Sequence, residues 1–341
     1  MSSSAPSETY ERVPLEIGKS RAGMDTEGVG REASLWKDAG RQLVRNPAFV
    51  IASILILIYV FMALFPQVIA PNGVTRELCN TRLGAQPPSS EFLFGLDDKG
   101  CPYFERVIYG VRPSMLIGPS VTVFAFSIAL IFGTLAGYYG GIIDTLIARV
   151  TDIILALPLI LGALVLITAF RNASPDDPEV SPIIRVLAGV FQTVDGFVNV
   201  NGIGIVVFVL VILGWPSMLR LARSSVIANK NSDYVEAARA LGASDLRIMT
   251  RHIIPNSLAP ILVYATITIG AVIVGEAALS FLGVGLQTPA ISWGLQLSTA
   301  QNRIQQDPHL MLFPGAFLAV LVFSFILLGD ALRDALDPKL R

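Results

Sequence analysis

The sequence of 341 residues has few charged residues, and this scarcity is its first informative feature. Charged residues make up 15% of the chain and hydrophobic residues 53%, whereas a soluble domain usually carries roughly a quarter charged residues. The formal net charge is −1, and nucleic-acid-binding proteins usually show a clustered basic excess. The composition therefore predicts a membrane protein and argues against a nucleic-acid partner.

Metal-binding and catalytic side chains are also scarce. The chain has two cysteines and two histidines, and His252 and His309 lie far apart without the spacing of a metal site. The sequence also lacks the G-x-x-x-x-G-K-[ST] loop that binds nucleotide phosphates. We therefore expect no metal site, no cofactor and no enzymatic activity in this chain, and any energy for its work must come from a partner.

Six long uncharged stretches are each long enough to cross a membrane. A spanning helix needs about 20 apolar residues, because each residue rises about 1.5 Å across a hydrocarbon core about 30 Å thick. The sequence therefore predicts an all-α, polytopic protein with six transmembrane helices, two of which are expected to bend at Pro119 and Pro158. The expected spans lie at about residues 47–69, 114–137, 150–170, 201–219, 256–282 and 311–329.

The distribution of lysine and arginine predicts the orientation of these spans. Cytoplasmic loops carry an excess of these residues, and most of the 25 in this chain lie on the side of the N-terminus. Both termini are therefore predicted to be cytoplasmic in a multi-pass protein of the cell membrane. Residues 70–113 then form an external loop, as does the segment near residues 171–200, and residues 220–255 form a cytoplasmic loop.

Two segments precede the first span. Residues 1–33 are polar and rich in Ser, Gly and Glu, which predicts a disordered cytoplasmic segment rather than a signal peptide. Residues 34–46 have the pattern of a short amphipathic helix at the membrane interface, with Trp36 at the depth that tryptophan prefers. The alternative is the first turn of an extended span, but Asn46-Pro47 favours a break there. Residues 47–341 then make up the transmembrane domain.

Cys79 and Cys101 both fall in the expected external loop. The outside of a cell is oxidising, so a disulfide between them is permitted. Closing a loop of this size would stabilise the fold by roughly 3 kcal/mol in the chain-entropy model. The alternative is a pair of free thiols.

Two further features lie inside the expected spans. Glu276 is a carboxylate in a hydrophobic stretch, which makes it a candidate pathway or gate residue because such a group is costly in lipid. Its alternative position is near the outer headgroups, where the cost is small. Gly133, Gly137 and Gly141 repeat every four residues, which permits close helix packing, within this chain rather than at a dimer seam.

The cytoplasmic loop at residues 220–255 carries signals for two short helices. Asp233 followed by Glu236 fits a helix start of the capping-box type, and Gly242 is a natural C-terminal stop. Ser244 can cap a second helix that runs to about Ile253. The sequence therefore predicts a helix, a glycine turn and a second helix between two spans.

The first of these helices carries a small apolar strip formed by Val235, Ala238 and Leu241. A helix that offers such a strip to a groove is a common docking mode, and the small Ala237 would allow a partner to approach closely. The alternative is a loop that lies on its own membrane domain.

The same loop carries a recognisable motif. Glu236-Ala237-Ala238, then Gly242, then Ile254-Pro255 resemble, at the same spacing, the EAA motif of importer permeases in the ABC transporter superfamily. The resemblance implies contact with ATP-binding partners for seven residues: Glu236, Ala237, Ala238, Leu241, Gly242, Ile254 and Pro255.

Longer stretches resemble the dipeptide/oligopeptide/nickel branch of that superfamily, and the chain is similar to its C-type permease. Cys101-Pro102 departs from the pattern, because the branch usually has a polar charged pair there. The stretches that carry the resemblance are FGLDDKG…ERVIYGVRPS from Phe94, YVEAARALGASDLRIMTRHIIPN, GEAALSFLGVGLQTPAISWG and GDALRDALDPKLR.

The resemblance implies a type I ABC importer permease fold and a set of partners. These are a homologous B-type permease, two ATP-binding domains or subunits that hold the ATP and Mg²⁺, and an external substrate-binding lipoprotein. The implied cargo is a dipeptide or oligopeptide, with nickel or another small solute as the alternative. Three other classes are alternatives: a secondary transporter or channel, a membrane enzyme and a membrane scaffold. Intramembrane charged relays or inverted repeats would favour the secondary transporter, and a catalytic constellation near the membrane would favour the enzyme.

Overall fold

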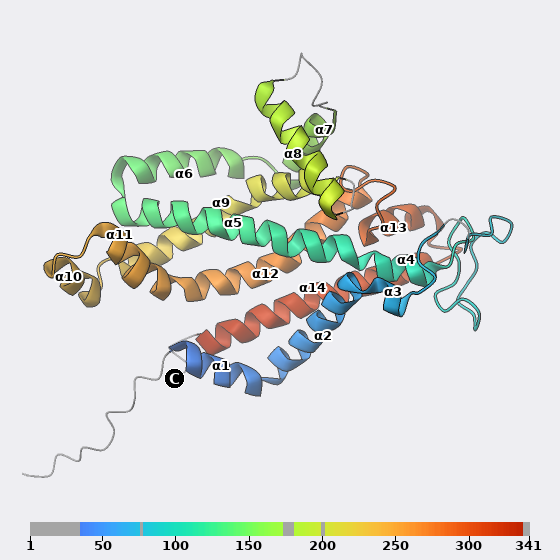
Figure 1. Cartoon of the computed structure of the whole chain (residues 1–341), viewed down its shortest axis with the longest axis horizontal. Helices are drawn as coiled ribbons and strands as arrows, with labels where there is room; N and C mark the ends of the chain where they lie inside the picture. The colour runs from blue at the N-terminus through green and yellow to red at the C-terminus, as the bar shows by residue number, and fades with distance from the viewer. Residues whose placement is uncertain (1–34, 76–77, 173–180, 199–201, 337–341) are drawn as a thin grey trace, which may run out of the picture.

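The computed structural model describes residues 35–75, 78–172, 181–198 and 202–336, and these residues are mostly helical (Figure 1). The predicted all-α class is confirmed, and the segment 1–33 lies outside the described residues. The helices are α1 (Leu35–Arg45), α2 (Pro47–Leu64), α3 (Pro66–Ile69), α4 (Tyr103–Tyr109), α5 (Val111–Tyr139), α6 (Gly141–Leu155), α7 (Leu159–Asn172), α8 (Pro182–Val198), α9 (Ile203–Asn229), α10 (Asp233–Ala240), α11 (Asp245–Ile248), the π-helix η2 (Met249–Ile253), α12 (Ile254–Phe281), α13 (Trp293–Ala300), the 3-10 helix η3 (Gln301–Arg303) and α14 (His309–Leu336).

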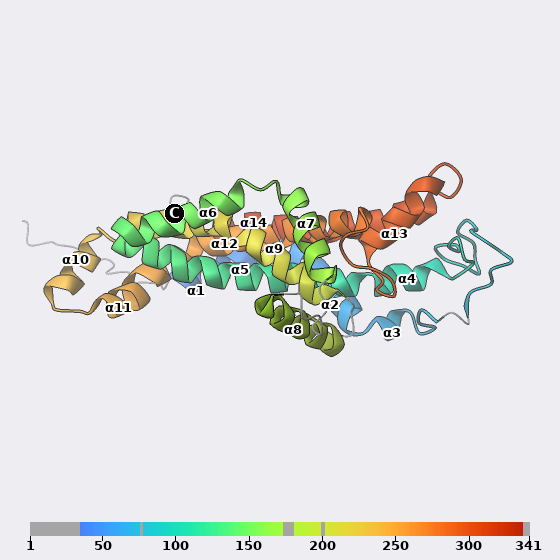
Figure 2. The same ribbon diagram turned by 90° about the horizontal axis from the view of Figure 1, so that it is seen from above.

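The long helices form an elongated bundle. α10 and α11 lie at one end, and α4, α13 and the long connection between α3 and α4 lie at the other (Figures 1 and 2). Among the described residues, five helical segments are long and apolar enough to span a membrane, and a sixth exists if the bent pair α6 and α7 is one span. The exposed apolar side chains of α2, such as Ile54 and Leu57, are what a lipid-facing helix presents.

The expected third span, residues 150–170, is not one helix. α6 and α7 are separated by a short break, and their axes differ by 88°. Proline lacks an N–H and disfavours the helical conformation in the preceding residue, so Pro158 is the local cause of the break. The bend predicted at Pro158 is confirmed, whereas the single helix is wrong; Pro119 lies inside the continuous helix α5.

The fourth and fifth spans are longer than the sequence predicts. α9 continues as one helix to Asn229, so the first ten residues of the predicted loop 220–255 belong to it. At the other end of the loop, α11, η2 and α12 follow one another without a break from Asp245 to Phe281. The loop outside regular spans is therefore shorter than expected, and it is joined to α9 and α12 by helical backbone.

α5 and α9 pack closely along their length. A Cβ on Gly133 would lie 2.7 Å from the Cβ of Ala222, and one on Gly137 would lie 2.8 Å from Cγ1 of Val226. These two glycines thus allow close packing within the chain, as predicted. Gly141 does not take part: it begins α6 with a φ of +55°, and an added Cβ would meet nothing within 4 Å.

The first helix is separate from the first span. α1 ends at Arg45, and the Asn46 side chain accepts a hydrogen bond of 2.9 Å from the N–H of Ala48 at the start of α2. This N-cap confirms the predicted break. The side chain of Trp36 lies outside the described side chains, and the interfacial depth of α1 remains a prediction.

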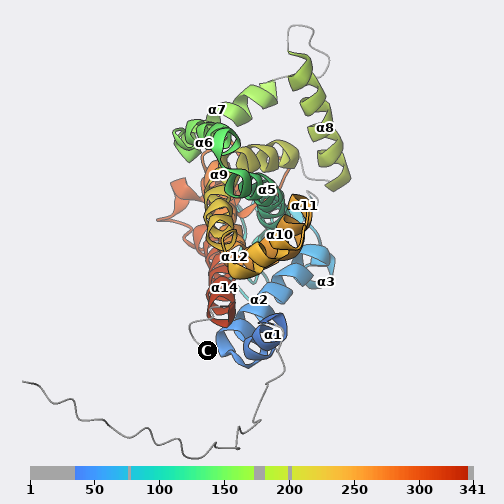
Figure 3. The ribbon, with the colours of Figure 1, turned by 90° about the vertical axis from the view of Figure 1, so that its left-hand side faces the viewer.

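The predicted external loop near residues 171–200 contains a helix that the sequence analysis does not predict. α8 lies beside the bundle, on the side of α6 and α7 (Figure 3). Its buried Phe191 packs against the rings of Phe170 and Phe208, which also contact each other. The carboxylate of Asp195 accepts hydrogen bonds of 2.7 Å from the N–H groups of Gly202 and Gly204, which fixes α8 to the first turn of α9.

Candidate functional site

The candidate coupling loop begins where α9 ends and contains α10, α11 and the turn between them. Ser232 is the N-cap of α10 and is extended, but its side chain makes no capping hydrogen bond. The helix therefore begins at Asp233, and the capping box expected from Asp233 and Glu236 is wrong. Both acidic residues lie in the first turn instead, where their charges favour the N-terminal end of the helix dipole.

Gly242 ends α10 as predicted. Its φ is +79°, a conformation that glycine adopts without a Cβ clash. The N–H of Gly242 donates to the carbonyl of Arg239, and the N–H of Ala243 donates to that of Ala238, both at 3.0 Å. These two bonds form a Schellman motif, which turns the chain sharply toward α11.

The apolar strip expected on α10 is divided between two faces. Val235 and Ala238 are buried and pack with Ile248 and Ile253, so for them the alternative of a loop lying on its own membrane domain is correct. Leu241 points away and is 88% exposed. The prediction of one continuous docking strip is therefore wrong, because the inner half of α10 holds the loop together.

The outer face of the loop contains a groove of about 380 Å³. Three of the motif residues line it, and Glu236 and Gly242 lie in the same loop but not in the lining. Ile254 and Pro255 begin α12 and also lie outside the lining. The other four lining residues were not predicted, because no motif in the sequence marks them. The groove is lined by Tyr234, Ala237, Ala238, Leu241, Ala243, Arg247 and His252.

Polar contacts tie this loop to the end of α5. The hydroxyl of Tyr138 donates a hydrogen bond of 2.6 Å to Asp245 at the start of α11. The ammonium group of Lys230, just after α9, donates to the carbonyls of Gly137 at 3.2 Å and Tyr138 at 3.4 Å. A displacement of the loop is therefore resisted by α5 as well as by the two helices that flank it in sequence.

An ion pair joins α6 to α9 close to the same end. The guanidinium of Arg223 donates two hydrogen bonds to the carboxylate of Asp144, one of them 2.6 Å from Nη2 to Oδ2. This fork geometry fixes direction as well as distance. The pair is partly exposed, and the residues lie too far apart in sequence for a local pattern to predict it.

Glu276 lies nearer the opposite end of the bundle and is completely buried. Its carboxylate accepts a hydrogen bond of 2.8 Å from Ser280 on its own helix and one of 3.4 Å from Ser114 on α5. The hydroxyl of Ser280 in turn accepts a bond from the N–H of Leu286. Glu276 thus faces serine hydroxyls inside this chain, and its role as a pathway or gate residue remains a prediction.

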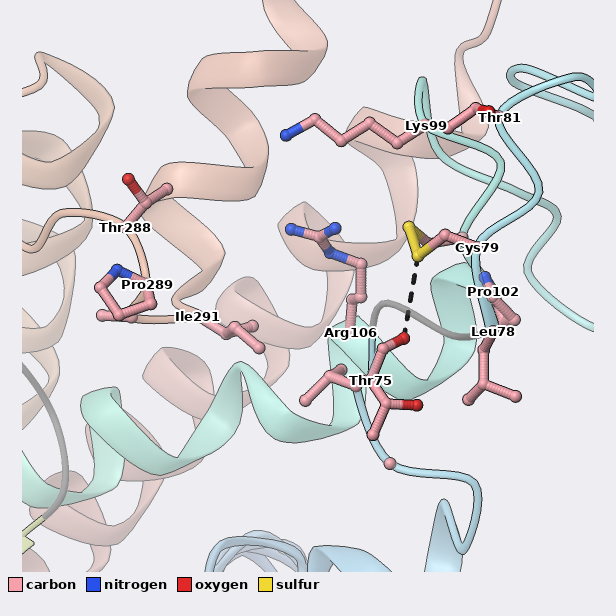
Figure 4. Close-up of a pocket in the computed structure, with 14 residues that line it drawn as sticks. Thr75, Leu78, Cys79, Thr81, Lys99, Pro102, Arg106, Thr288, Pro289 and Ile291 are labelled. Atoms are coloured by element: carbon pink, nitrogen blue, oxygen red, sulfur yellow. Dashed lines mark hydrogen bonds between the residues drawn. A yellow bond between two sulfur atoms is a disulfide. The ribbon is translucent and has the colours of Figure 1, made fainter.

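The opposite end also contains the Cys79–Cys101 disulfide that the sequence predicts. The disulfide borders a cavity of about 430 Å³ (Figure 4). The connection between α3 and α4, Arg106 of α4 and the connection between α12 and α13 form its walls. Among the described residues, no group of three or more His, Cys, Asp or Glu is placed to hold a metal ion.

Comparisons with known proteins cover nearly the whole chain. Residues 129–341 match the family described as the binding-protein-dependent transport system inner membrane component, and residues 34–88 match the N-terminal TM domain of oligopeptide transport permease C. The dipeptide transport system permease protein DppC of Alkalihalophilus pseudofirmus is 38% identical, over 90% of this chain and 91% of that protein. The oligopeptide transport system permease protein OppC of Bacillus subtilis is 33% identical, over 93% of this chain and 94% of that protein.

A solved structure supports the fold independently. The MetNI methionine ABC transporter in an inward-facing conformation contains a chain that matches with a TM-score of 0.52 and 19% identity. The match covers 69% of this chain and 98% of that one. At this level of identity the likeness shows a shared fold.

Proposed function

Because this chain belongs to the binding-protein-dependent transport system inner membrane components, a family of multi-pass membrane permeases, we propose that it is the C-type permease of an ATP-driven peptide importer. The observation that carries the proposal is the exposed groove on the α10–α11 loop, lined by Ala237, Ala238 and Leu241 of the motif. A groove at the end of the bundle, beside an almost fully exposed leucine, suits a soluble partner.

The names of the relatives favour peptides as cargo. The chain is similar along most of its length to a dipeptide permease and to an oligopeptide permease, and glutathione, the cargo in the name of a third relative, is itself a small peptide. This agreement favours peptides over nickel or another small solute. The cargo is inferred separately from the coupling to ATP hydrolysis, because the α10–α11 loop bears only on the coupling.

The proposed complex contains this chain, a homologous B-type permease, two ATP-binding subunits and an external binding lipoprotein. The ATP-binding subunits would hold the ATP and Mg²⁺ and seat the α10–α11 loop of each permease. With the ATP-binding subunits in the cytoplasm, the α10–α11 end of this chain is cytoplasmic and the end with the disulfide is external. A disulfide is stable on the oxidising side of a membrane, which agrees with that orientation.

The contacts of the loop supply the physical route for coupling. Val235 and Ala238 pack α10 against Val226 of α9 and against Ile248 and Ile253, which precede α12 in the same continuous helix, so the loop is packed rather than loosely attached. Tyr138 and Lys230 join it to the end of α5. A force applied to the groove would therefore displace α5, α9 and α12 together, because each is held to the loop by packing, hydrogen bonds or continuous helix.

The test is to replace Leu241 and Glu236 by alanine in the assembled complex and to measure ATPase activity and peptide uptake in vesicles. Burial of a leucine side chain contributes about 1.5–3 kcal/mol, so Leu241→Ala should weaken binding of the ATP-binding subunit by roughly 10- to 100-fold. The matched control is Leu246→Ala, because Leu246 is also exposed in this loop but does not line the groove. Unchanged coupling in both Leu241→Ala and Glu236→Ala would disprove the assignment.

A further inference from the structure

The cavity at the disulfide end has the size and shape of a small-ligand site. Its volume of about 430 Å³ falls within the range of about 300–1,000 Å³ that is typical of ligand pockets. Its walls come from three segments distant in sequence, and the Cys79–Cys101 disulfide ties two of them together. The lining residues are Gly73, Val74, Thr75, Leu78, Cys79, Thr81, Lys99, Cys101, Pro102, Arg106, Thr288, Pro289, Ala290 and Ile291.

The described residues of this lining carry charge of one sign. Among them Lys99 and Arg106 are the ionisable residues, and both are cationic. Figure 4 shows their charged ends pointing the same way, toward the side where Thr288 and Ile291 lie. Lys99 is exposed and its ammonium group forms no ion pair among the described residues. An anion in the cavity would therefore meet one unneutralised cation.

The buried carboxylate of Asp97 forms an ion pair with Arg106, one of these two cations. Asp97 is buried, and its Oδ1 accepts hydrogen bonds of 2.9 Å from the N–H groups of Lys99 and Cys101. Its Oδ2 accepts one of 2.7 Å from Nη1 of Arg106. Asp97 thus orients Arg106, and among the described residues the other N–H groups of the guanidinium have no hydrogen-bond acceptor. Asp97 and Asp98 line a smaller neighbouring cavity, which shares Lys99 and Arg106 with this one.

The rest of the lining is mixed. Leu78, Pro289 and Ile291 supply apolar surface, and Thr75, Thr81 and Thr288 supply hydroxyl groups. A site with two cations, hydroxyls and an apolar wall fits a ligand that has a carboxylate and an uncharged side chain on one carbon atom. The C-terminal residue of a peptide has this chemistry.

We propose that this cavity is a subsite for the C-terminal residue of a peptide, with Lys99 and Arg106 binding the terminal carboxylate. The proposal rests on the proposed function, which makes this end external and peptides the cargo. An acidic side chain of the binding lipoprotein would also present a carboxylate, but it would not fill so large and partly apolar a cavity. The volume therefore favours a peptide terminus over a protein side chain.

The experiment uses the reconstituted complex without its binding lipoprotein and measures, by calorimetry, binding of a dipeptide with an apolar C-terminal residue. The dipeptide is compared with its C-terminal amide. Lys99→Gln should weaken binding of the free acid by roughly three- to tenfold, because a charge-assisted bond at a partly exposed site is lost. Lys99→Arg should restore most of the affinity, and the amide should bind weakly to all three proteins.

A second measurement separates the possible failures. If the wild-type complex with its lipoprotein takes up peptides but the free acid and the amide bind equally well, the subsite is absent and the proposed function stands. If Lys99→Gln weakens docking of the lipoprotein and leaves dipeptide binding unchanged, the cavity receives a protein side chain and the proposal is overturned. If the wild-type complex takes up no peptide, the proposed function itself fails.

Discussion

Replacing Gly133 by alanine should force α5 and α9 apart. The new Cβ would lie 2.7 Å from the Cβ of Ala222 and 3.2 Å from the backbone nitrogen of Arg223. Neither atom can rotate away, because both are fixed to the backbone of α9. Carbon atoms normally pack at about 3.5–4.0 Å, so α9 would have to move by about 1 Å along the line that joins these atoms.

Two opposing effects decide the size of the change. Overpacking a close contact costs about 1–3 kcal/mol, whereas exchanging glycine for alanine inside a helix favours the helix by about 1 kcal/mol. The net loss for Gly133→Ala should therefore be about 1 kcal/mol. Gly137→Ala should behave similarly, because its Cβ would lie 2.8 Å from Cγ1 of Val226. The double variant should lose less than the sum, since one displacement of α9 relieves both clashes.

The measurement is the apparent melting temperature of the purified chain in one detergent, for the single and double variants. Gly214→Ala is the matched control, because Gly214 also lies inside α9 but an added Cβ there would meet nothing within 4 Å. It should melt at or above the wild-type temperature. If Gly133→Ala melted as high as Gly214→Ala, the close packing of α5 against α9 would be refuted.

Three more changes have defined outcomes. Gly242→Ala should destabilise the α10–α11 turn by about 1 kcal/mol because of its positive φ and speed hydrogen exchange there, whereas Gly242→Asn should retain near-normal exchange; equal exchange in both would contradict the backbone argument. A double-mutant cycle of Asp144→Asn and Arg223→Gln should give a coupling energy of about 0.2–1 kcal/mol in thermal stability, because the pair is partly exposed, and a coupling energy of zero would mean that the pair does not stabilise the fold. Replacing Cys79 and Cys101 together by serine should cost about 3 kcal/mol of local stability and make the connecting loop sensitive to protease, whereas unchanged digestion would show that the disulfide does not constrain it.

The sequence was sufficient to predict most of the spanning helices. Long uncharged runs must be helical in lipid, because every backbone N–H and C=O has to be paired inside the segment. The third span shows where this argument stops. Pro158 predicts a bend, but the bend of 88° between α6 and α7 depends on what the two halves pack against.

The coupling loop likewise has one feature that local sequence predicts and one that it does not. Gly242 predicts the end of α10 because a left-handed residue after a helix is a local preference. Neighbouring residues in the sequence do not decide which face of α10 is buried. Val235 and Ala238 are buried and Leu241 is exposed, and this outcome depends on where Ile248 and Ile253 lie when η2 continues into α12.

The membrane class, the approximate spans, the helix–glycine–helix loop and the family resemblance can all be predicted from the sequence. These follow from hydrophobicity, backbone preference and motif spacing, which act over a few neighbouring residues. Only the tertiary structure placed Tyr138 beside Asp245, 107 positions away, and Ser114 beside Glu276, 162 positions away. It also turned Lys99 and Arg106 toward one cavity. Such contacts are set by how the helices cross and pack, and no short stretch of sequence contains that geometry.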